Sequence, residues 1–160
     1  MIPSVEESGG SARLEGWARE TAAERESMDR QEQIEFLLDY YENPRRKQAM
    51  PDAEAVVEGG NPGCGDIVTI YLKVDPQTSR AEVTFEGTGC TISQASASYL
   101  AEEATGKTIE EVLVIDYNDL MDALGKEIVE QRTRCATLSL DTLRAAIRKR
   151  EREKLLVAGP

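Results

Sequence analysis

Three cysteines and one aspartate are the residues of this sequence best suited to chemistry. The turn NPGCGD contains Cys64 and Asp66, the segment EGTGC ends on Cys90, and RTRCATLS contains Cys135. Thiolates and carboxylates bind zinc or the iron of an iron–sulfur cluster. The chain has no histidine, so any metal site must be built without the commonest nitrogen ligand.

A different interpretation is that the cysteines are small, buried core residues. Their surroundings argue against this, because Cys64 and Cys90 lie among glycines and turn residues rather than in an apolar stripe, and Cys135 follows RTR. Asp66 alone could be a turn cap, which is the commoner use of aspartate near glycine. Its neighbour Cys64 favours a ligand role.

The composition restricts the class of protein. With 19 Lys and Arg against 30 Asp and Glu the net charge is −11, which disfavours a nucleic-acid partner because phosphates would be repelled. No apolar stretch approaches the roughly 20 residues of a membrane span, and a signal-peptide pattern is missing, so we expect no membrane association and a cytoplasmic location. Thiols stay reduced there, and an odd number of cysteines disfavours a disulfide framework.

The chain is expected to divide into an extension and one domain. Residues 1–26 are mostly small, polar or charged, and we interpret them as a mobile N-terminal extension. Residues 27–155 form the domain. It begins with a helix from Met28 that Pro44 ends, followed by a linker that contains Pro51 and Gly59.

An antiparallel hairpin is predicted for the middle of the chain. DIVTIYLKV (66–74) and AEVTFEG (81–87) both alternate apolar and polar residues, and the turn DPQTSR joins them. Cys64 precedes the first strand and Cys90 follows the second, so pairing brings both to the same end of the hairpin.

Helices are expected after the hairpin. TISQASASYLAEEATGK begins directly after Cys90, Thr108 and Glu111 match a capping box, and the last helix begins at Cys135 and ends in a charged tail. Cys90 and Cys135 thus lie at helix N-termini, where the helix dipole stabilises a thiolate. If the fold also brings Cys135 to that end of the hairpin, the three thiolates and Asp66 make four ligands on one exposed site, the number that tetrahedral zinc or an iron–sulfur cluster requires.

The motifs taken together resemble a known family. GNPGCGD, EGTGCTISQASAS, GKTIEE and RCATLS are similar to the cysteine motifs of the IscU/SufU/NifU N-terminal family of iron–sulfur cluster assembly proteins. DYYENPR is similar to the end of that family's first helix. The resemblance runs from about Met28 to about Lys149.

This resemblance implies an α+β fold of the SufE/NifU-like type, a small antiparallel sheet packed against several helices. It also implies a scaffold or carrier rather than an enzyme, with a [2Fe–2S] cluster as its cofactor. The partners would be a cysteine desulfurase and apo iron–sulfur acceptor proteins, and the oligomeric state is not predicted. The implied ligands of the cluster or metal are Cys64, Asp66, Cys90 and Cys135, with Asp66 as the carboxylate that makes the cluster labile.

Two departures leave alternatives open. Arg134 stands where IscU-type scaffolds usually have histidine, which favours the alternative of a zinc-bound SufU-type sulfur acceptor that takes persulfide sulfur from the desulfurase. Cys135 follows Cys90 by only 45 positions, however, which is the shorter, IscU-like spacing. A structural zinc site in an interaction module is a third interpretation, disfavoured by Asp66 because such sites usually close with four Cys or His ligands.

Overall fold

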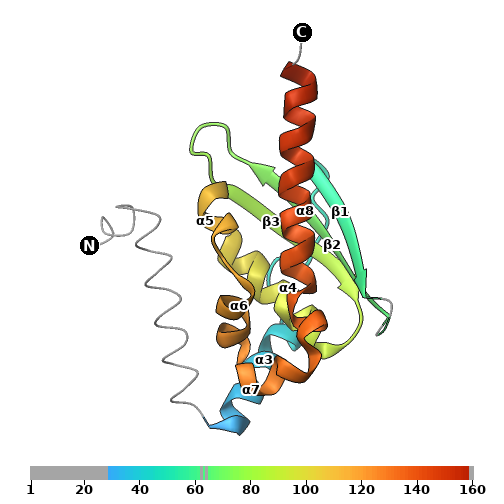
Figure 1. Ribbon diagram of the computed structural model, residues 1–160, viewed down its shortest axis with the longest axis vertical. Coiled ribbons are helices and arrows are strands. Elements are labelled where there is room, and N and C mark those ends of the chain that lie inside the picture. The colour runs from blue at the N-terminus through green and yellow to red at the C-terminus, as the bar shows by residue number, and fades with distance from the viewer. Residues whose placement is uncertain (1–28, 62, 64, 159–160) are drawn as a thin grey trace, which may run out of the picture.

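The computed structural model describes residues 29–61, 63 and 65–158 of the chain. In this part the fold is α+β, as expected: a three-stranded antiparallel sheet in the order β1-β2-β3, with helices packed against one face (Figure 1). The predicted extension, residues 1–26, lies outside the described residues.

The sheet contains the predicted hairpin and one more strand. Its strands are β1 Ala55–Asn61, β2 Asp66–Val74 and β3 Ala81–Thr88. Along β2, alternate residues from Val68 to Val74 are buried against the helices, while Ile67 on the opposite face is exposed. The period of two that predicted β2 and β3 therefore also determines which face carries the core.

The prediction of a linker before the hairpin is wrong for the second half of that segment, which forms strand β1. Residues 55–61 pair with β2 along their whole length, from Ala55 opposite Leu72 to Asn61 opposite Asp66. This strand contains Gly59 and Gly60, although glycine in the interior of a strand usually weakens it. Here a Cβ on Gly59 would lie 2.1 Å from Thr142 Oγ1, so the glycine is required for α8 to pack closely on the strand.

Four helices agree with the sequence prediction. They are α3 Arg30–Glu42, α4 Thr91–Ala104, α5 Ile109–Leu113 and α8 Thr133–Ala158. Asp29 forms a capping box with Glu32 at the start of α3, and Thr108 forms the predicted box with Glu111. The charged tail after residue 150 is solvent-exposed as expected, but it continues as part of α8.

The segment between α5 and α8 is helical too, which the sequence did not indicate to us. It comprises α6 Tyr117–Leu124, α7 Lys126–Val129 and the 3-10 turn η1 Glu130–Arg132. Asp116 caps α6 through a box with Asp119, and Gly125, in a left-handed conformation, ends it. These short elements carry the chain to the start of α8 and so place Cys135.

The helices form a layer over the sheet. Helix α8 packs on β1 and β2, α4 packs on β3 and against α8, and α3 covers the outer side of α4. Between α4 and α8, the Ser96 hydroxyl donates to the Ala136 carbonyl at 2.6 Å and contacts the Ser139 hydroxyl at 3.1 Å. The small residues of α4 allow this close packing of the two helices.

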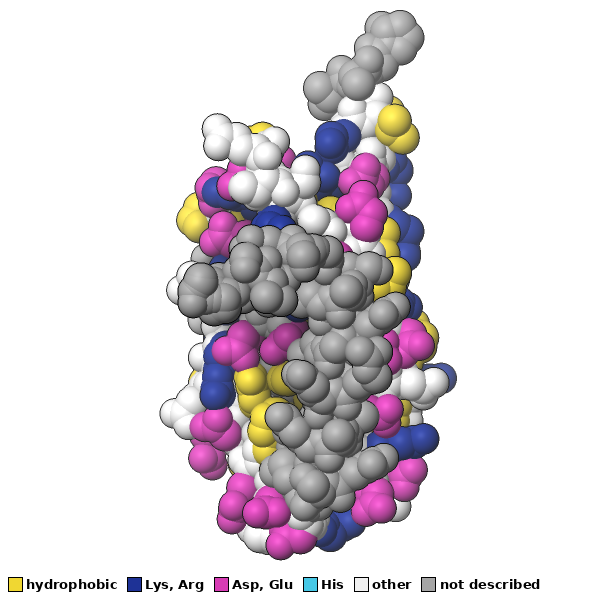
Figure 2. Space-filling view, turned by 90° about the vertical axis from the view of Figure 1, so that its left-hand side faces the viewer, with side chains coloured by type: hydrophobic (Ala, Val, Ile, Leu, Met, Phe, Trp, Pro, Cys, Tyr) yellow, Lys and Arg dark blue, Asp and Glu magenta, His cyan; other side chains and the backbone are white. Residues whose placement is uncertain are grey.

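Charged side chains of both signs cover the surface. Figure 2 shows many Asp and Glu side chains over the lower part of the face it presents, with Lys and Arg among them. Near the end of α8 that projects beyond the sheet in Figure 1, five basic residues are interspersed with Glu151 and Glu153: Arg148, Lys149, Arg150, Arg152 and Lys154. Among the described residues, no helix is both long and apolar enough to cross a membrane.

Candidate metal centre

The site begins with Asp66, the first residue of β2. Because side chains alternate along a strand, Asp66 points to the same side of the sheet as Val68 and Ile70, toward the helices. Its side chain is buried, with 1% of the residue exposed. A carboxylate in such a position needs hydrogen-bond donors or a cation to compensate for lost hydration.

Cys90 supplies one of those donors. It is the N-cap of α4, and its backbone N–H donates to Asp66 Oδ1 at 2.7 Å. The turn before it crosses Asp66 closely: Gly89 has φ +143°, and a Cβ there would lie 2.3 Å from Asp66 Oδ1. Glycine at position 89 is therefore what lets the chain reach this hydrogen bond.

Cys135 lies in the first turn of α8 and is also buried, with 1% of the residue exposed. Its sulfur accepts a hydrogen bond from the side-chain amide of Asn61, with 3.6 Å between Nδ2 and Sγ. Asn61 ends β1 directly opposite Asp66. The ends of two strands and the starts of two helices thus meet at one point.

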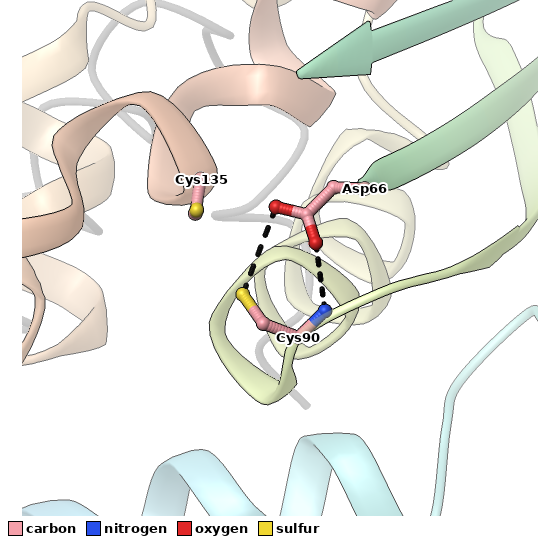
Figure 3. Close-up of side chains that lie close together, drawn as sticks. All are labelled: Asp66, Cys90 and Cys135. Carbon is pink, nitrogen blue, oxygen red and sulfur yellow. Dashed lines mark hydrogen bonds between the residues drawn. The ribbon is translucent and has the colours of Figure 1, made fainter. Parts of the chain in front are cut away.

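Asp66, Cys90 and Cys135 converge there, with one ligand atom from each within 4.8 Å of the others. Figure 3 shows the three side chains pointing toward one another, and Cys90 Sγ lies 3.7 Å from Asp66 Oδ2. Cys64, the fourth predicted ligand, lies outside the described residues. The group is less exposed than we expected, because only Cys90 is partly accessible.

Hydrogen bonds favour the charged form of the carboxylate. Burial raises the pKa of Asp66, but donation from the Cys90 N–H and from neighbouring thiol and hydroxyl groups outweighs this and holds the pKa below its ordinary value. Cys90 Sγ in turn accepts from the Ser93 N–H at 3.5 Å, at the start of α4. The site is thus arranged for anionic ligands.

Comparison with known proteins decides the family. The profile of the NifU-like N-terminal domain matches residues 32–155, which is most of the chain and includes every residue of the site. The chain belongs to this family.

Curated members with more specific descriptions are also similar. An iron–sulfur cluster assembly scaffold protein IscU of Archaeoglobus fulgidus is 41% identical over 112 residues, covering 69% of this chain and 71% of the relative. The zinc-dependent sulfurtransferase SufU of Bacillus subtilis is 34% identical over 134 residues, covering 73% of this chain and 90% of the relative. The family thus includes relatives of both kinds considered above.

A solved structure gives the same fold. The crystal structure of a protein assigned to iron–sulfur cluster assembly in the SUF system of Fervidobacterium islandicum matches with a TM-score of 0.58 and 32% identity, covering 70% of this chain and 93% of that one. The antiparallel sheet covered by helices is therefore the fold of this NifU-like domain.

The ligand atoms found in the described residues are of the types that bind zinc or an iron–sulfur cluster. Two sulfurs and one carboxylate oxygen from three separate elements are the ligand types that bind zinc or cluster iron. A further thiolate would complete four-coordination, and Cys64, the one residue between Gly63 and Gly65 in the sequence, is the candidate.

Two residues that contact this site were missed from the sequence. Gly89 makes room for the bond between Cys90 and Asp66, and Asn61 contacts Cys135. Glycine beside a candidate ligand was a usable signal for Gly89. Asn61 offered no comparable signal, because its role depends on β1, which the two neighbouring glycines concealed.

Proposed function

We propose that this protein is an iron–sulfur cluster assembly scaffold that binds iron and sulfide through Cys64, Asp66, Cys90 and Cys135 and transfers the cluster to acceptor proteins. The observation that carries this proposal is the convergence of Asp66, Cys90 and Cys135 within 4.8 Å, in a chain of the NifU-like family. Residues far apart in sequence meet there with metal-binding groups.

The mixture of ligands fits temporary binding. Thiolates bind iron strongly and supply most of the stability of the site, whereas a hard carboxylate oxygen binds the soft iron–sulfide core weakly and exchanges readily. Asp66 therefore opens a coordination position at little energetic cost when an acceptor arrives. We propose a [2Fe–2S] cluster as the bound species, because its two irons have four terminal ligand positions between them.

The surroundings support an anionic site. Three thiolates and a carboxylate around a [2Fe–2S] core leave net negative charge, which Arg132 and Arg134, just before Cys135, offset in part. Sulfur comes from a cysteine desulfurase, and apo iron–sulfur proteins receive the product. The protein is then a carrier and not an enzyme.

A second candidate is a zinc-bound sulfur acceptor. It is favoured by Arg134 at the position before Cys135 and by the 34% identity to the SufU sulfurtransferase. In this function a thiolate attacks the persulfide of the desulfurase, so that one S–S bond forms as another breaks and the desulfurase thiolate leaves. The same four residues would hold zinc.

Metal analysis separates the two candidates. The protein is purified without oxygen, reconstituted with iron, cysteine and a desulfurase, and analysed for iron, acid-labile sulfide and zinc together with its visible spectrum. The scaffold predicts iron and sulfide in equal amounts and a brown colour. Stoichiometric zinc that iron and sulfide do not replace would support the sulfur acceptor and overturn the scaffold.

Cysteine variants connect the result to the site. Cys90→Ala and Cys135→Ala each remove one strong metal–sulfur bond, so cluster assembly is expected to be lost in both. Asp52→Ala controls for general effects of a substitution to alanine, because Asp52 pairs with Lys73 near the other end of β2, away from the site. Normal cluster content in either cysteine variant would place the ligands elsewhere.

A further inference from the structure

Asn61 occupies an unusual place for an amide side chain. It is the last residue of β1, stands opposite Asp66 in the register, and is buried with 8% of the residue exposed. Asp66 and Asn61 are a cross-strand pair, and both end up buried next to the start of α8. A buried amide in such a position is costly unless it makes hydrogen bonds.

The amide nitrogen of Asn61 faces the sulfur of Cys135. Nδ2 lies 3.6 Å from Sγ, although the residues are 74 positions apart, whereas Oδ1 lies on the side of Gly63. A metal-bound thiolate has lone pairs and no proton, so only the NH₂ half of an amide can pair with it. The orientation therefore matches the ligand form of Cys135.

The two described sulfurs receive equivalent hydrogen bonds from different sources. Cys90 Sγ accepts from the backbone N–H of Ser93, which the helix N-terminus provides. Cys135 Sγ accepts from the side chain of Asn61. This second donor belongs to a side chain, so substitution can remove it.

We propose that Asn61 is a positioning residue of the metal site, whose amide orients Cys135 Sγ and withdraws electron density from that sulfur when it binds metal. Donors of this kind, one bond away from the metal ligands, hold the ligands in place and tune the metal. The inference rests on the proposed function and adds a residue to it. Asn61 also contributes to the turn that follows β1, where its backbone carbonyl accepts from the Gly65 N–H at 2.9 Å. A substitution of the side chain retains this backbone bond, so it tests the side-chain amide alone.

Cobalt(II) tests this directly, because sulfur-to-cobalt charge-transfer bands report electron density on the bound thiolates. Wild type, Asn61→Ala, Asn61→Leu and Asn118→Ala are titrated with Co²⁺ without oxygen. Leucine fills the space without a donor, and Asn118 is an exposed asparagine of α6 that serves as the control. Thermal unfolding of the metal-free proteins checks the fold.

Both Asn61 variants are expected to shift the charge-transfer bands to longer wavelength, because a sulfur without its hydrogen bond is richer in electrons. Their affinity for Co²⁺ should fall about tenfold, the lower range for loss of such a supporting contact. Asn118→Ala should match wild type in both respects.

The possible outcomes are distinct. Bands and affinity of Asn61→Leu equal to those of wild type overturn the inference and leave the proposed function standing. A red shift in Asn61→Leu with an unchanged thermal midpoint supports it, since a purely structural role would not move the bands. Wild type that binds Co²⁺ without sulfur-to-cobalt bands overturns the proposed thiolate site and this inference with it.

Discussion

At the scale of single residues, the site depends on one buried carboxylate and the groups that surround it. Asp66 is buried and yet has a lowered pKa, because the Cys90 N–H and neighbouring donors outweigh the effect of burial. The carboxylate is therefore already charged and oriented before metal arrives. Little reorganisation is needed for it to act as a ligand.

Gly89→Ala tests how closely this arrangement is built. The added Cβ would lie 2.3 Å from Asp66 Oδ1 at a φ of +143°, so the turn must move and the hydrogen bond from Cys90 must lengthen. We expect a loss of about 1–3 kcal/mol in the free energy of unfolding and weaker Co²⁺ binding, measured by urea denaturation and metal titration.

Gly106→Ala is the matched control for that experiment. Gly106 also has a positive φ, +95°, but a Cβ there would meet no atom within 4 Å. It should lower stability through backbone strain and leave metal binding unchanged. Equal effects of the two substitutions on metal binding would show that contact with Asp66 is unimportant.

Residues with distinctive chemistry could be singled out from the sequence. Cysteines in turns beside glycine, and an aspartate close to one of them, drew attention to Asp66, Cys90 and Cys135, whose ligand atoms lie within 4.8 Å of one another; that they bind metal stays a prediction. Exposure was less predictable, since the burial of Cys135 depends on how α8 meets the sheet. Asn61 is an ordinary residue by type, and only the tertiary structure brings it to Cys135.

At the scale of elements, the packing of α8 on β1 fixes where Cys135 lies. Gly59 brings the helix close to the strand, and two polar contacts fasten the pair further along: Arg150 with Glu54 at 2.7 Å, and Lys149 Nζ with the Val56 carbonyl at 3.0 Å. A displacement of α8 would separate Cys135 from Asp66.

A double-mutant cycle measures this packing. Gly59→Ala should destabilise the protein by about 1–3 kcal/mol, because the new Cβ overlaps Thr142 Oγ1 and the helix must shift. In a Thr142→Ala background the obstructing hydroxyl is gone, so the cost of Gly59→Ala should drop below about 1 kcal/mol. The measurement is urea denaturation of all four proteins. Additive effects would mean that the two positions do not compete for space.

Strands and helices with regular patterns were predictable, and those fixed by context were not. Alternation identified β2 and β3, helical spacing ended by Pro44 identified α3, and the capping box of Thr108 and Glu111 identified α5. β1 was missed because glycine is a poor strand former, and the reason for Gly59, its close contact with α8, becomes visible only in the tertiary structure. The short helices α6 and α7 had signals in Asp116 and Gly125 that our interpretation did not use.

At the scale of the whole molecule, the described residues share one hydrophobic core, and the same elements carry the site. The family profile begins at residue 32, and the described core is formed by elements from α3 onward. Residues 1–26 are mostly small, polar or charged, and they include the single tryptophan, Trp17. We propose that this segment is an extension outside the domain of residues 27–155.

Deletion of residues 1–26 should therefore leave the thermal midpoint within about 3 °C of the full chain, equivalent to about 1 kcal/mol or less. Metal content should be unchanged. Trp17 gives an independent readout in the full chain, where its fluorescence should be that of a solvent-exposed indole. A blue-shifted emission together with a large drop in midpoint on deletion would assign the segment to the folded domain.

The central claim is that Asp66 is the exchangeable ligand of a cluster that the thiolates hold. Asp66→Ala retains every thiolate, so it is expected to assemble a cluster under the anaerobic conditions given above. Release should suffer instead, because the weak oxygen ligand that opens a coordination position is gone. Asp52→Ala controls for the loss of a carboxylate, because Asp52 pairs with Lys73 near the other end of β2.

The most direct test is the rate of cluster transfer from each reconstituted protein to an apo-ferredoxin, followed by visible absorption or circular dichroism. The account predicts that wild type and Asp52→Ala transfer at the same rate and that Asp66→Ala, although loaded with cluster, transfers roughly tenfold more slowly. Assembly and transfer by Asp66→Ala at the wild-type rate would contradict it and reduce Asp66 to a structural acceptor for the Cys90 N–H.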